Sequence, residues 1–243
     1  MAWLYIIKTG STYDTFAPDN GDFEDWVRQG LDEEVAPRVR LISAHEGEAL
    51  PPVEACAGVV ITGSHAMVTD RESWSEAIAA WLPGVLAARV PLLAICYGHQ
   101  LLAQATGGEV GYHPQGKEVG SVPISLTGAA GDDMLFGGLP SHFLAHATHS
   151  QTVLKLPPDA VLLAANDHEP HHAFRLGKWA WGIQFHPEFT ALVMREYIHQ
   201  QADALQREQQ NPQALIAGVR ETPVAAKILR RFGGLVSKTT RGA

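Results

Sequence analysis

Cys96 stands between a short apolar run and a segment with helical spacing. The run Pro91 to Ile95 is unbroken, as in a strand that is buried on both faces. From Gly98 the apolar residues recur at a helical period, and Gly107 and Gly108 end the predicted helix. A thiol at such a turn lies near free N–H groups, which favour a thiolate and can bind an oxyanion. The stretch predicts a cysteine nucleophile; the alternative is a buried cysteine that merely ends a core strand.

A histidine and a glutamate stand two residues apart at the end of a second predicted strand, residues 179–185. Side chains two apart on an extended chain point to the same side. His186 can therefore face a thiol while Glu188 fixes the tautomer of its ring. Pro187 cannot continue a helix and is expected to keep the pair extended. The two stretches together favour a cysteine nucleophile with a histidine base.

Cysteine, histidine and glutamate in this chain order resemble the class I, triad-type glutamine amidotransferases. The matching motifs are AICYGHQLLAQATGG, with Gln100 four residues after the nucleophile, and GIQFHPE near the C-terminal end. With the glycine turn Thr62-Gly63-Ser64, the resemblance spans roughly residues 57 to 190. The position two before the cysteine is usually glycine in the family and is Ala94 here, which is still small. The turn Gly63-Ser64-His65, where many members have Gly-Gly-Pro, resembles a stand-alone, GMP-synthase-like subgroup that includes γ-glutamyl peptidases.

The resemblance implies a mechanism with named roles. Cys96 would attack the γ-amide carbon of glutamine or of a γ-glutamyl compound, and His186, oriented by Glu188, would move the proton. Backbone N–H groups of Tyr97 and of the Gly63-Ser64 turn would hold the oxyanion. A γ-glutamyl thioester would form, and water would hydrolyse it.

Other residues are assigned only through the resemblance. Gln100 is expected to contact the bound glutamine, and His149 and Ser150 match a short turn that contacts the amino-acid end of the substrate. Glu118 matches a family glutamate and is expected to support the site without a direct chemical role. Cys56 precedes an apolar strand without a glycine turn and is expected to be a packed residue.

The reaction that follows amide cleavage is left open by the sequence. We find no ATP-pyrophosphatase loop and no P-loop, so the chain is expected to be a free-standing γ-glutamyl hydrolase or a glutaminase subunit that delivers ammonia to a synthetase partner. A non-catalytic binding module is the third alternative. The loop at residues 9–20 should overhang the same crevice as Cys96 and help to bind what lies beyond the γ-glutamyl group through Tyr13, Asp14 and Asp19, with Lys8 close by; the alternative is an ordinary surface loop.

Two further patterns, a P-loop-like motif and a group of histidines, have ordinary structural explanations. GYHPQGK, residues 111–117, matches the first part of a P-loop, but Glu118 follows in place of Ser or Thr and no helix comes next, so a turn is favoured. Six of twelve histidines fall between residues 142 and 172. His142, His146 and His149 would point to different faces of a strand, so scattered surface and loop histidines are favoured over a metal site. No metal and no cofactor is expected.

Composition fits an ordinary globular protein. The 243 residues are 46% hydrophobic and 18% charged, with a net charge of −8 from 18 basic and 26 acidic residues. This balance argues against a nucleic-acid surface. No signal peptide or apolar run long enough for a bilayer is visible, so no membrane association is expected. With only two cysteines, a reducing compartment fits, and we expect a cytoplasmic protein that acts on a small-molecule substrate.

Predicted strands alternate with helices in the first half of the chain. Strands are expected at residues 3–7, 39–42, 57–61 and 91–95, with a long helix at about 71–88. Pro83 inside that helix suggests a kink or two shorter helices. The alternation predicts an α/β fold with a doubly wound, mostly parallel sheet flanked by helices. Ligands bind at the carboxyl ends of such strands, where Cys96, Gly63 and His186 all fall.

The second half of the chain has a different pattern of predicted secondary structure. Residues 108–127 form short β-like pieces that predict a small β-hairpin excursion. Four more strands are expected at 143–147, 160–165, 172–176 and 179–185, and helical spacing returns after Glu188. We expect one domain over residues 1–243, with a core at about 1–200 and a C-terminal helical extension at about 201–243.

Overall fold

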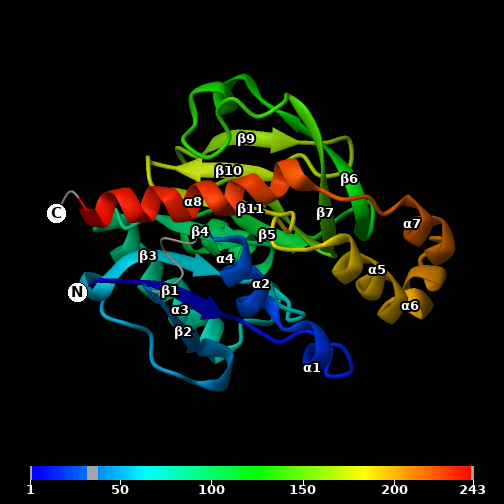
Figure 1. Ribbon diagram of the computed structural model, residues 1–243, viewed down its shortest axis with the longest axis horizontal. Coiled ribbons are helices and arrows are strands. Elements are labelled where there is room, and N and C mark those ends of the chain that lie inside the picture. The colour runs from blue at the N-terminus through cyan, green and yellow to red at the C-terminus, as the bar shows by residue number, and fades with distance from the viewer. Residues whose placement is uncertain (1, 32–37, 242–243) are drawn as a thin grey trace.

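The computed structural model describes residues 2–31 and 38–241 of the chain. In that part of the chain, nine strands form one sheet in the order β2-β1-β3-β4-β11-β10-β9-β6-β7 (Figure 1). Five neighbouring strands at one end of the sheet are parallel, and four strands continue it in antiparallel fashion. The parallel strands are β1 (Trp3–Lys8), β2 (Val39–Ser43), β3 (Cys56–Ile61), β4 (Leu92–Ile95) and β11 (Ala180–Ile183). The antiparallel strands are β10 (Ala173–Leu176), β9 (Val161–Ala165), β6 (Glu118–Leu126) and β7 (His142–His149).

Helices flank the sheet, so the predicted doubly wound α/β fold is confirmed. They are α1 (Ala17–Asn20), α2 (Phe23–Gly30), α3 (Ser73–Ala87), α4 (Tyr97–Ala105), α5 (Ala191–Gln200), α6 (Ala202–Arg207), α7 (Pro212–Gly218) and α8 (Pro223–Arg241). Short 3₁₀ turns lie at Ala44–Glu46, Val53–Ala55, Val68–Asp70 and Gly128–Asp132. Pro83 lies inside α3, which is a single helix and not two shorter ones. Among the described residues, no helix combines the length and the apolar character that crossing a bilayer requires.

The predicted hairpin at residues 108–127 is wrong in its pairing. The strand β5 (Glu109–Tyr112) pairs with β8 (Gln151–Lys155), which the sequence analysis did not identify. Strand β6 pairs instead with β7 and β9 in the main sheet. The difference has a physical cause: β6 buries Val122 and Ile124 in the main core, whereas β5 is short and has no fully buried side chain. Burial therefore decides the partner of β6.

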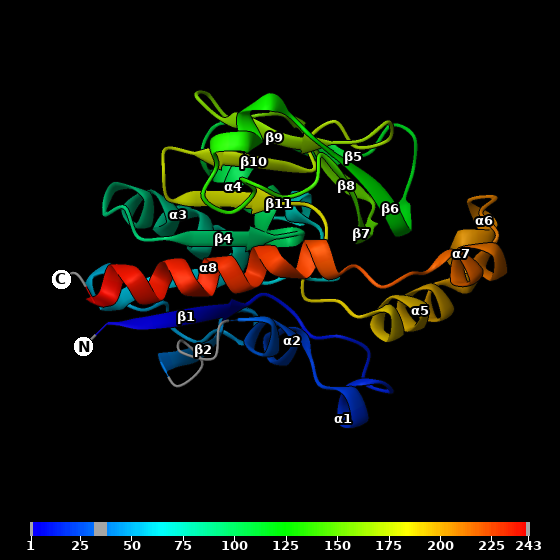
Figure 2. The ribbon, with the colours of Figure 1, turned by 45° about the horizontal axis from the view of Figure 1, so that its top comes forward.

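Alternate side chains of the parallel strands pack on opposite faces of the sheet, as the strand period requires. Leu4 and Ile6 of β1 pack with α2 and α8, and Tyr5 and Ile7 pack with α3 and α4. Figure 2 shows α8 crossing one face of the sheet, with α3 and α4 behind it. The segments α5, α6 and α7 lie beyond the carboxyl ends of the parallel strands (Figures 1 and 2). The site at that end of the sheet therefore has helical walls.

The long helix α8 packs directly on the sheet. Its buried side chains recur at helical spacing and belong to the same core cluster as the parallel strands: Ala225, Ile228, Leu229, Phe232 and Val236. The approach is close, because a Cβ built on Gly58 of β3 would lie 2.6 Å from a methyl carbon of Val236. These contacts support the proposal that the chain forms one domain, to whose core the C-terminal helical segment contributes.

Candidate active site

Cys96 lies at the carboxyl end of β4 and precedes α4 as its N-cap residue. Its φ of 50° is a backbone conformation that residues other than glycine rarely adopt. Gly98 allows the sharp turn, because a Cβ at this position would lie 2.9 Å from the carbonyl oxygen of Ile61. Cys96 is buried, and its Sγ lies 3.9 Å from the carbonyl oxygen of Thr148. The structure thus has the strand-to-helix turn that the sequence predicts.

His186 follows β11, and its backbone is tied to β7. The N–H of His186 donates a 2.8 Å hydrogen bond to the carbonyl oxygen of His146. Nδ1 of the ring lies 2.7 Å from Oε1 of Glu188. Pro187 and Glu188 form a turn, so the prediction of an extended pair is wrong; no strand in the described part of the chain pairs with these two residues, and proline itself favours turns. The turn still brings the carboxylate onto the ring.

The charge on His186 follows from its neighbours. Burial by itself lowers the pKa of His186, but the negative charges of Glu188 and Cys96 outweigh it and raise the pKa to about 10. The ring is therefore an imidazolium near neutral pH, and its Nδ1–H donates to Glu188. Nε2 is buried and makes no hydrogen bond of good geometry among the described residues, although the Cys96 thiol lies close enough to help raise the pKa of the ring. That nitrogen is available to a group in the pocket.

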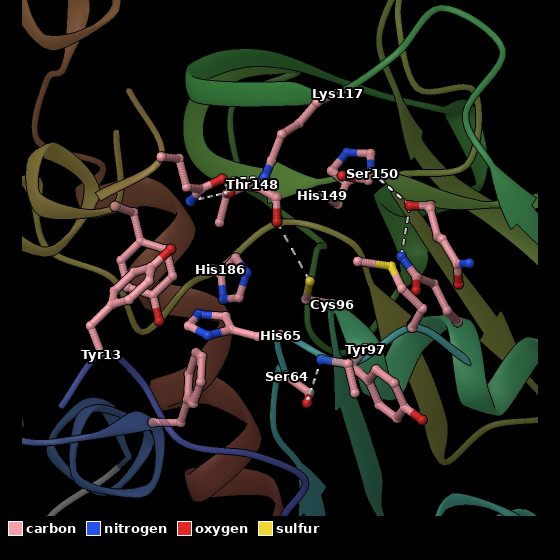
Figure 3. Close-up of a pocket in the computed structure, with 17 residues that line it drawn as sticks. Tyr13, Ser64, His65, Cys96, Tyr97, Lys117, Thr148, His149, Ser150 and His186 are labelled. Atoms are coloured by element: carbon pink, nitrogen blue, oxygen red, sulfur yellow. Dashed lines mark hydrogen bonds between the residues drawn. The ribbon is translucent and has the colours of Figure 1, made fainter. Parts of the chain in front are cut away.

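The turn at Gly63 and Ser64 is anchored from behind. The carbonyl oxygen of Gly63 accepts hydrogen bonds from Oγ1 of Thr9 at 2.9 Å and of Thr62 at 3.0 Å. Because the peptide bond is trans, the N–H of Ser64 points the opposite way from that carbonyl. Tyr97 is the first residue of α4, so its N–H has no acceptor within the helix. Ser64 and Tyr97 both line the same pocket as Cys96 (Figure 3).

The pocket has a volume of about 280 Å³ and is lined by the predicted nucleophile and base together. Besides Cys96 and His186 it contacts Gln100, His149 and Ser150, which the sequence analysis assigned to substrate binding. The side-chain nitrogen of Gln100 is already engaged, since it donates to the carbonyl oxygen of Gln151 at 2.7 Å and to Oε1 of Gln184 at 2.9 Å. The sequence-predicted residues are therefore gathered at one place.

The ring of His149 makes its hydrogen bonds inside the protein. Nδ1 lies 2.9 Å from the carbonyl oxygen of Gln151, and Nε2 lies 3.0 Å from Oε2 of Glu118. His172 is also fully buried beside Glu118. With His146, these rings contradict the prediction of scattered surface and loop histidines. The periodicity of β7 did not reveal this burial, because the residues that contact His146 and His149 come from β6, from His186 after β11 and from His172 after β9.

Three of the four side chains predicted to act from the loop at residues 9–20 or beside it do not line the pocket. Tyr13 lines the pocket, as expected. Asp14 and Asp19 are exposed and do not line it. Lys8 pairs with Asp22 and with Glu24, each at 2.8 Å, and so holds α2 against β1.

Cys56, the second cysteine of the chain, lies in a different environment from Cys96. It begins β3, and its Sγ donates to the carbonyl oxygen of Pro52 at 3.5 Å. Burial, with the negative charge of Glu54, raises the pKa of Cys56 to about 11. A thiol with so high a pKa is a poor nucleophile at neutral pH.

Comparison with known proteins agrees with this arrangement. The family model for glutamine amidotransferase class-I matches residues 19–203, well over half of the chain. The chain belongs to the class I glutamine amidotransferase family. Two solved amidotransferases share the fold: one from Thermotoga maritima (TM-score 0.76, 22% identity, covering 97% of this chain and 98% of that one) and one from Methylobacillus flagellatus (TM-score 0.76, 23% identity, covering 100% and 95%).

Relatives with higher sequence identity are GMP synthases of the same amidotransferase family. A glutamine-hydrolyzing GMP synthase of Aeropyrum pernix is 38% identical over 159 residues, a match that covers 65% of this chain and 28% of that protein. One subunit of the glutamine-hydrolyzing GMP synthase of Methanopyrus kandleri is 30% identical over 171 residues, covering 70% of this chain and 86% of that subunit. The chain thus matches only about a quarter of the length of the first curated relatives.

Proposed function

We propose that this chain is an enzyme that hydrolyses the γ-amide of glutamine or of a γ-glutamyl compound through Cys96, His186 and Glu188. The observation that carries the proposal is the state of the His186 ring. One nitrogen is bound to Glu188 at 2.7 Å, and the other is buried, unpartnered among the described residues, and borders the pocket that Cys96 lines. A base oriented in this way beside a thiol matches the requirement for nucleophilic catalysis. The glutamine-hydrolyzing relatives support glutamine as a substrate.

The residues present support a two-step reaction. The Cys96 thiolate attacks the γ-carbonyl carbon, a C–S bond forms, and the oxygen becomes an oxyanion that faces the N–H groups of Ser64 and Tyr97. Each such donor stabilises the transition state by about 3 to 4 kcal/mol. The C–N bond then breaks as imidazolium His186 gives its proton to the leaving nitrogen, which leaves a γ-glutamyl thioester. His186 next takes a proton from water, the water oxygen attacks the thioester, and glutamate is released as the C–S bond breaks.

The amino-acid end of the substrate is proposed to lie on the side of the pocket formed by Gln100, Ser150 and the backbone at His149. This assignment follows the family resemblance, and the position of all three residues at the pocket supports it. Glu118 supports this side through its hydrogen bond to His149 and has no direct chemical role.

The first experiment is to incubate the purified chain with glutamine, glutathione and γ-glutamyl dipeptides and to measure released glutamate. We expect release from at least one of them, and none from Cys96→Ser. Absence of release from all of them by the wild-type chain would contradict hydrolysis by the isolated protein.

A second candidate is a glutaminase subunit that delivers ammonia to a synthetase. The observation that favours it is the match to 86% of one GMP synthase subunit of Methanopyrus kandleri, whereas only 28% of the longer Aeropyrum pernix enzyme is matched. In that case a synthetase copurifies with the chain from its native cells, and glutamine hydrolysis by the isolated chain rises when that partner is added.

A further inference from the structure

The pocket extends to both sides of Cys96. Figure 3 shows Tyr13, His65 and His186 on one side of the thiol and His149 and Ser150 on the other. The side with Ser150 is the one proposed for the amino-acid end of the substrate. Apart from His186 itself, the residues on the other side have no role in the proposed function so far, yet they contribute much of the pocket lining.

The chemistry assigns an occupant to the His186 side. His186 has to protonate the nitrogen that leaves the γ-carbonyl carbon, so this nitrogen must lie within hydrogen-bond reach of the ring. Whatever substituent the nitrogen carries then lies on the same side of the thiol as the ring. Ammonia, the leaving group of glutamine, is too small to fill this space.

We call this side of the pocket the leaving-group chamber and define it by Tyr13, His65, Lys117, Tyr197 and Gln201. The rings of Tyr13, His65 and Tyr197 form one wall of the chamber. The ring centroids of Tyr13 and His65 are 4.7 Å apart, and those of His65 and Tyr197 are 5.6 Å apart. Burial, with the nearby charge of Lys117, lowers the pKa of His65, so its ring is neutral near pH 7. The wall is therefore uncharged and suits an apolar group.

Lys117 supplies a cation to the chamber. It precedes β6, is half-buried and lines the pocket, and its Nζ donates to Oε1 of Gln201. Within the described part of the chain, no carboxylate oxygen lies at ion-pair distance from this ammonium, whereas the buried ammonium of Lys8 has two such partners at 2.8 Å. A half-buried charge with only a neutral amide partner is costly unless an anion joins it. Burial lowers the pKa of Lys117, and the negative charges of Glu208 and Cys96 offset this only in part.

We propose that the leaving-group chamber selects γ-glutamyl amino acids: the carboxylate of the departing amino acid binds the Lys117 ammonium, and its apolar side chain packs on Tyr13 and His65. This proposal rests on the proposed function. In the first step the amide C–N bond breaks, the proton of His186 passes to the nitrogen, and a free amino acid leaves. Water then hydrolyses the thioester as before, so the products are glutamate and one amino acid.

The test compares three substrates: glutamine, γ-glutamyl-phenylalanine, and γ-glutamyl-phenethylamide, which lacks only the carboxylate. We expect Lys117→Gln to lower the ratio of kcat/KM for γ-glutamyl-phenylalanine over that for γ-glutamyl-phenethylamide by about tenfold or more, mainly through KM, as for loss of a hydrogen bond to a charged group. Lys117→Arg should restore part of this ratio. Lys178→Gln, at an exposed lysine outside the pocket, is the matched control and should keep the wild-type ratio.

Two outcomes would overturn the inference and leave the proposed function intact. One is hydrolysis of glutamine without hydrolysis of γ-glutamyl-phenylalanine by the wild-type chain. The other is an equal loss on all three substrates in Lys117→Gln, which would mean that Lys117 binds the γ-glutamyl head or acts on Cys96. Inactivity of the wild-type chain on every substrate would instead count against the proposed function itself.

Discussion

Oε2 of Glu118 lies 3.0 Å from Nε2 of His149, with both side chains buried behind the pocket. Burial raises the pKa of Glu118, but the hydrogen bond from His149 and the ring of His172, whose Nε2 lies 3.1 Å from Oε2, outweigh it and hold that pKa well below its usual range. Glu118 is therefore a carboxylate in the folded protein. Since Ser150 and Gln151 follow His149 directly and line the pocket, the position of this strand end depends on the buried hydrogen bond between His149 and Glu118.

Glu118→Gln should destabilise the fold, because the buried carboxylate that contacts His149 and His172 is replaced by an amide that cannot pair with both rings. A buried polar group left without its partner costs about 1 to 3 kcal/mol, and more where a charge is involved. A depressed pKa stabilises the fold above the unfolded value of 4.5 and loses that contribution as the pH falls, so the difference from wild type should shrink below about pH 4.5. Urea unfolding at several pH values measures this. Glu109→Gln is the control: its ion pair with Lys155 is exposed, so the change should be within about 0.5 kcal/mol. Equal effects of the two variants would contradict the assignment.

A glutamine-derived electrophile should label Cys96 and spare Cys56. Cys96 borders the pocket beside an imidazolium, whereas the pKa of Cys56 is raised to about 11. Peptide mapping by mass spectrometry gives the modified site. Cys56→Ser should be labelled as fast as wild type, and Cys96→Ser should remain unlabelled. Modification of Cys56 alone in the wild-type chain would sink the nucleophile assignment.

His186→Asn should lose activity on the order of 10⁴-fold or more, since the group proposed to protonate the leaving nitrogen is gone. Glu188→Gln should lose less, because the amide can still hold the ring at Nδ1 while the charge that favours the imidazolium is gone. Steady-state release of glutamate gives kcat for both variants. If Glu188→Gln is as inactive as His186→Asn, then Glu188 takes part in proton transfer directly.

The parallel part of the sheet was predictable because each of its strands has a local signal. The apolar runs at 3–7, 57–61 and 91–95 match β1, β3 and β4 to within one residue or so at each end. The pairing of β5 and β6 was not predictable, because it depends on which distant strand offers a buried face. Strand β8 was missed because two of its residues, Gln151 and Thr152, are polar although they are buried.

The residues of the candidate site, like the strands, were predictable only where the sequence signal is local. The motifs around Cys96 and His186 are contiguous in sequence, so their residue types and spacing were sufficient to identify them. Lys117 was dismissed with its P-loop-like motif, because its position in the pocket depends on the helices that follow β11. Gln201, its hydrogen-bond partner, lies 84 residues away in sequence. No local pattern could have joined these two residues.

Gly63→Ala should abolish most of the activity while it leaves the protein folded. A Cβ at Gly63 would lie 2.9 Å from Cε1 of His186, the ring carbon between Nδ1 and Nε2. Relieving that contact has to move the ring or the Ser64 turn, and a displacement of about 1 Å at a catalytic group costs on the order of 10²-fold in rate. Overpacking by one methyl group costs stability by only about 1 to 3 kcal/mol. The variant should therefore be nearly inactive under conditions in which it is still folded.

Gly234→Ala separates this effect from a general cost of adding a methyl group. Gly234 lies inside α8, and a Cβ there meets no heavy atom within 4 Å. Alanine is the better helix former, so this variant should be about 1 kcal/mol more stable than wild type and equally active. The two variants are compared by kcat/KM for glutamine and by the urea midpoint. Full activity in Gly63→Ala would mean that the ring of His186 tolerates displacement. The proposed need for an accurately positioned base would then be contradicted.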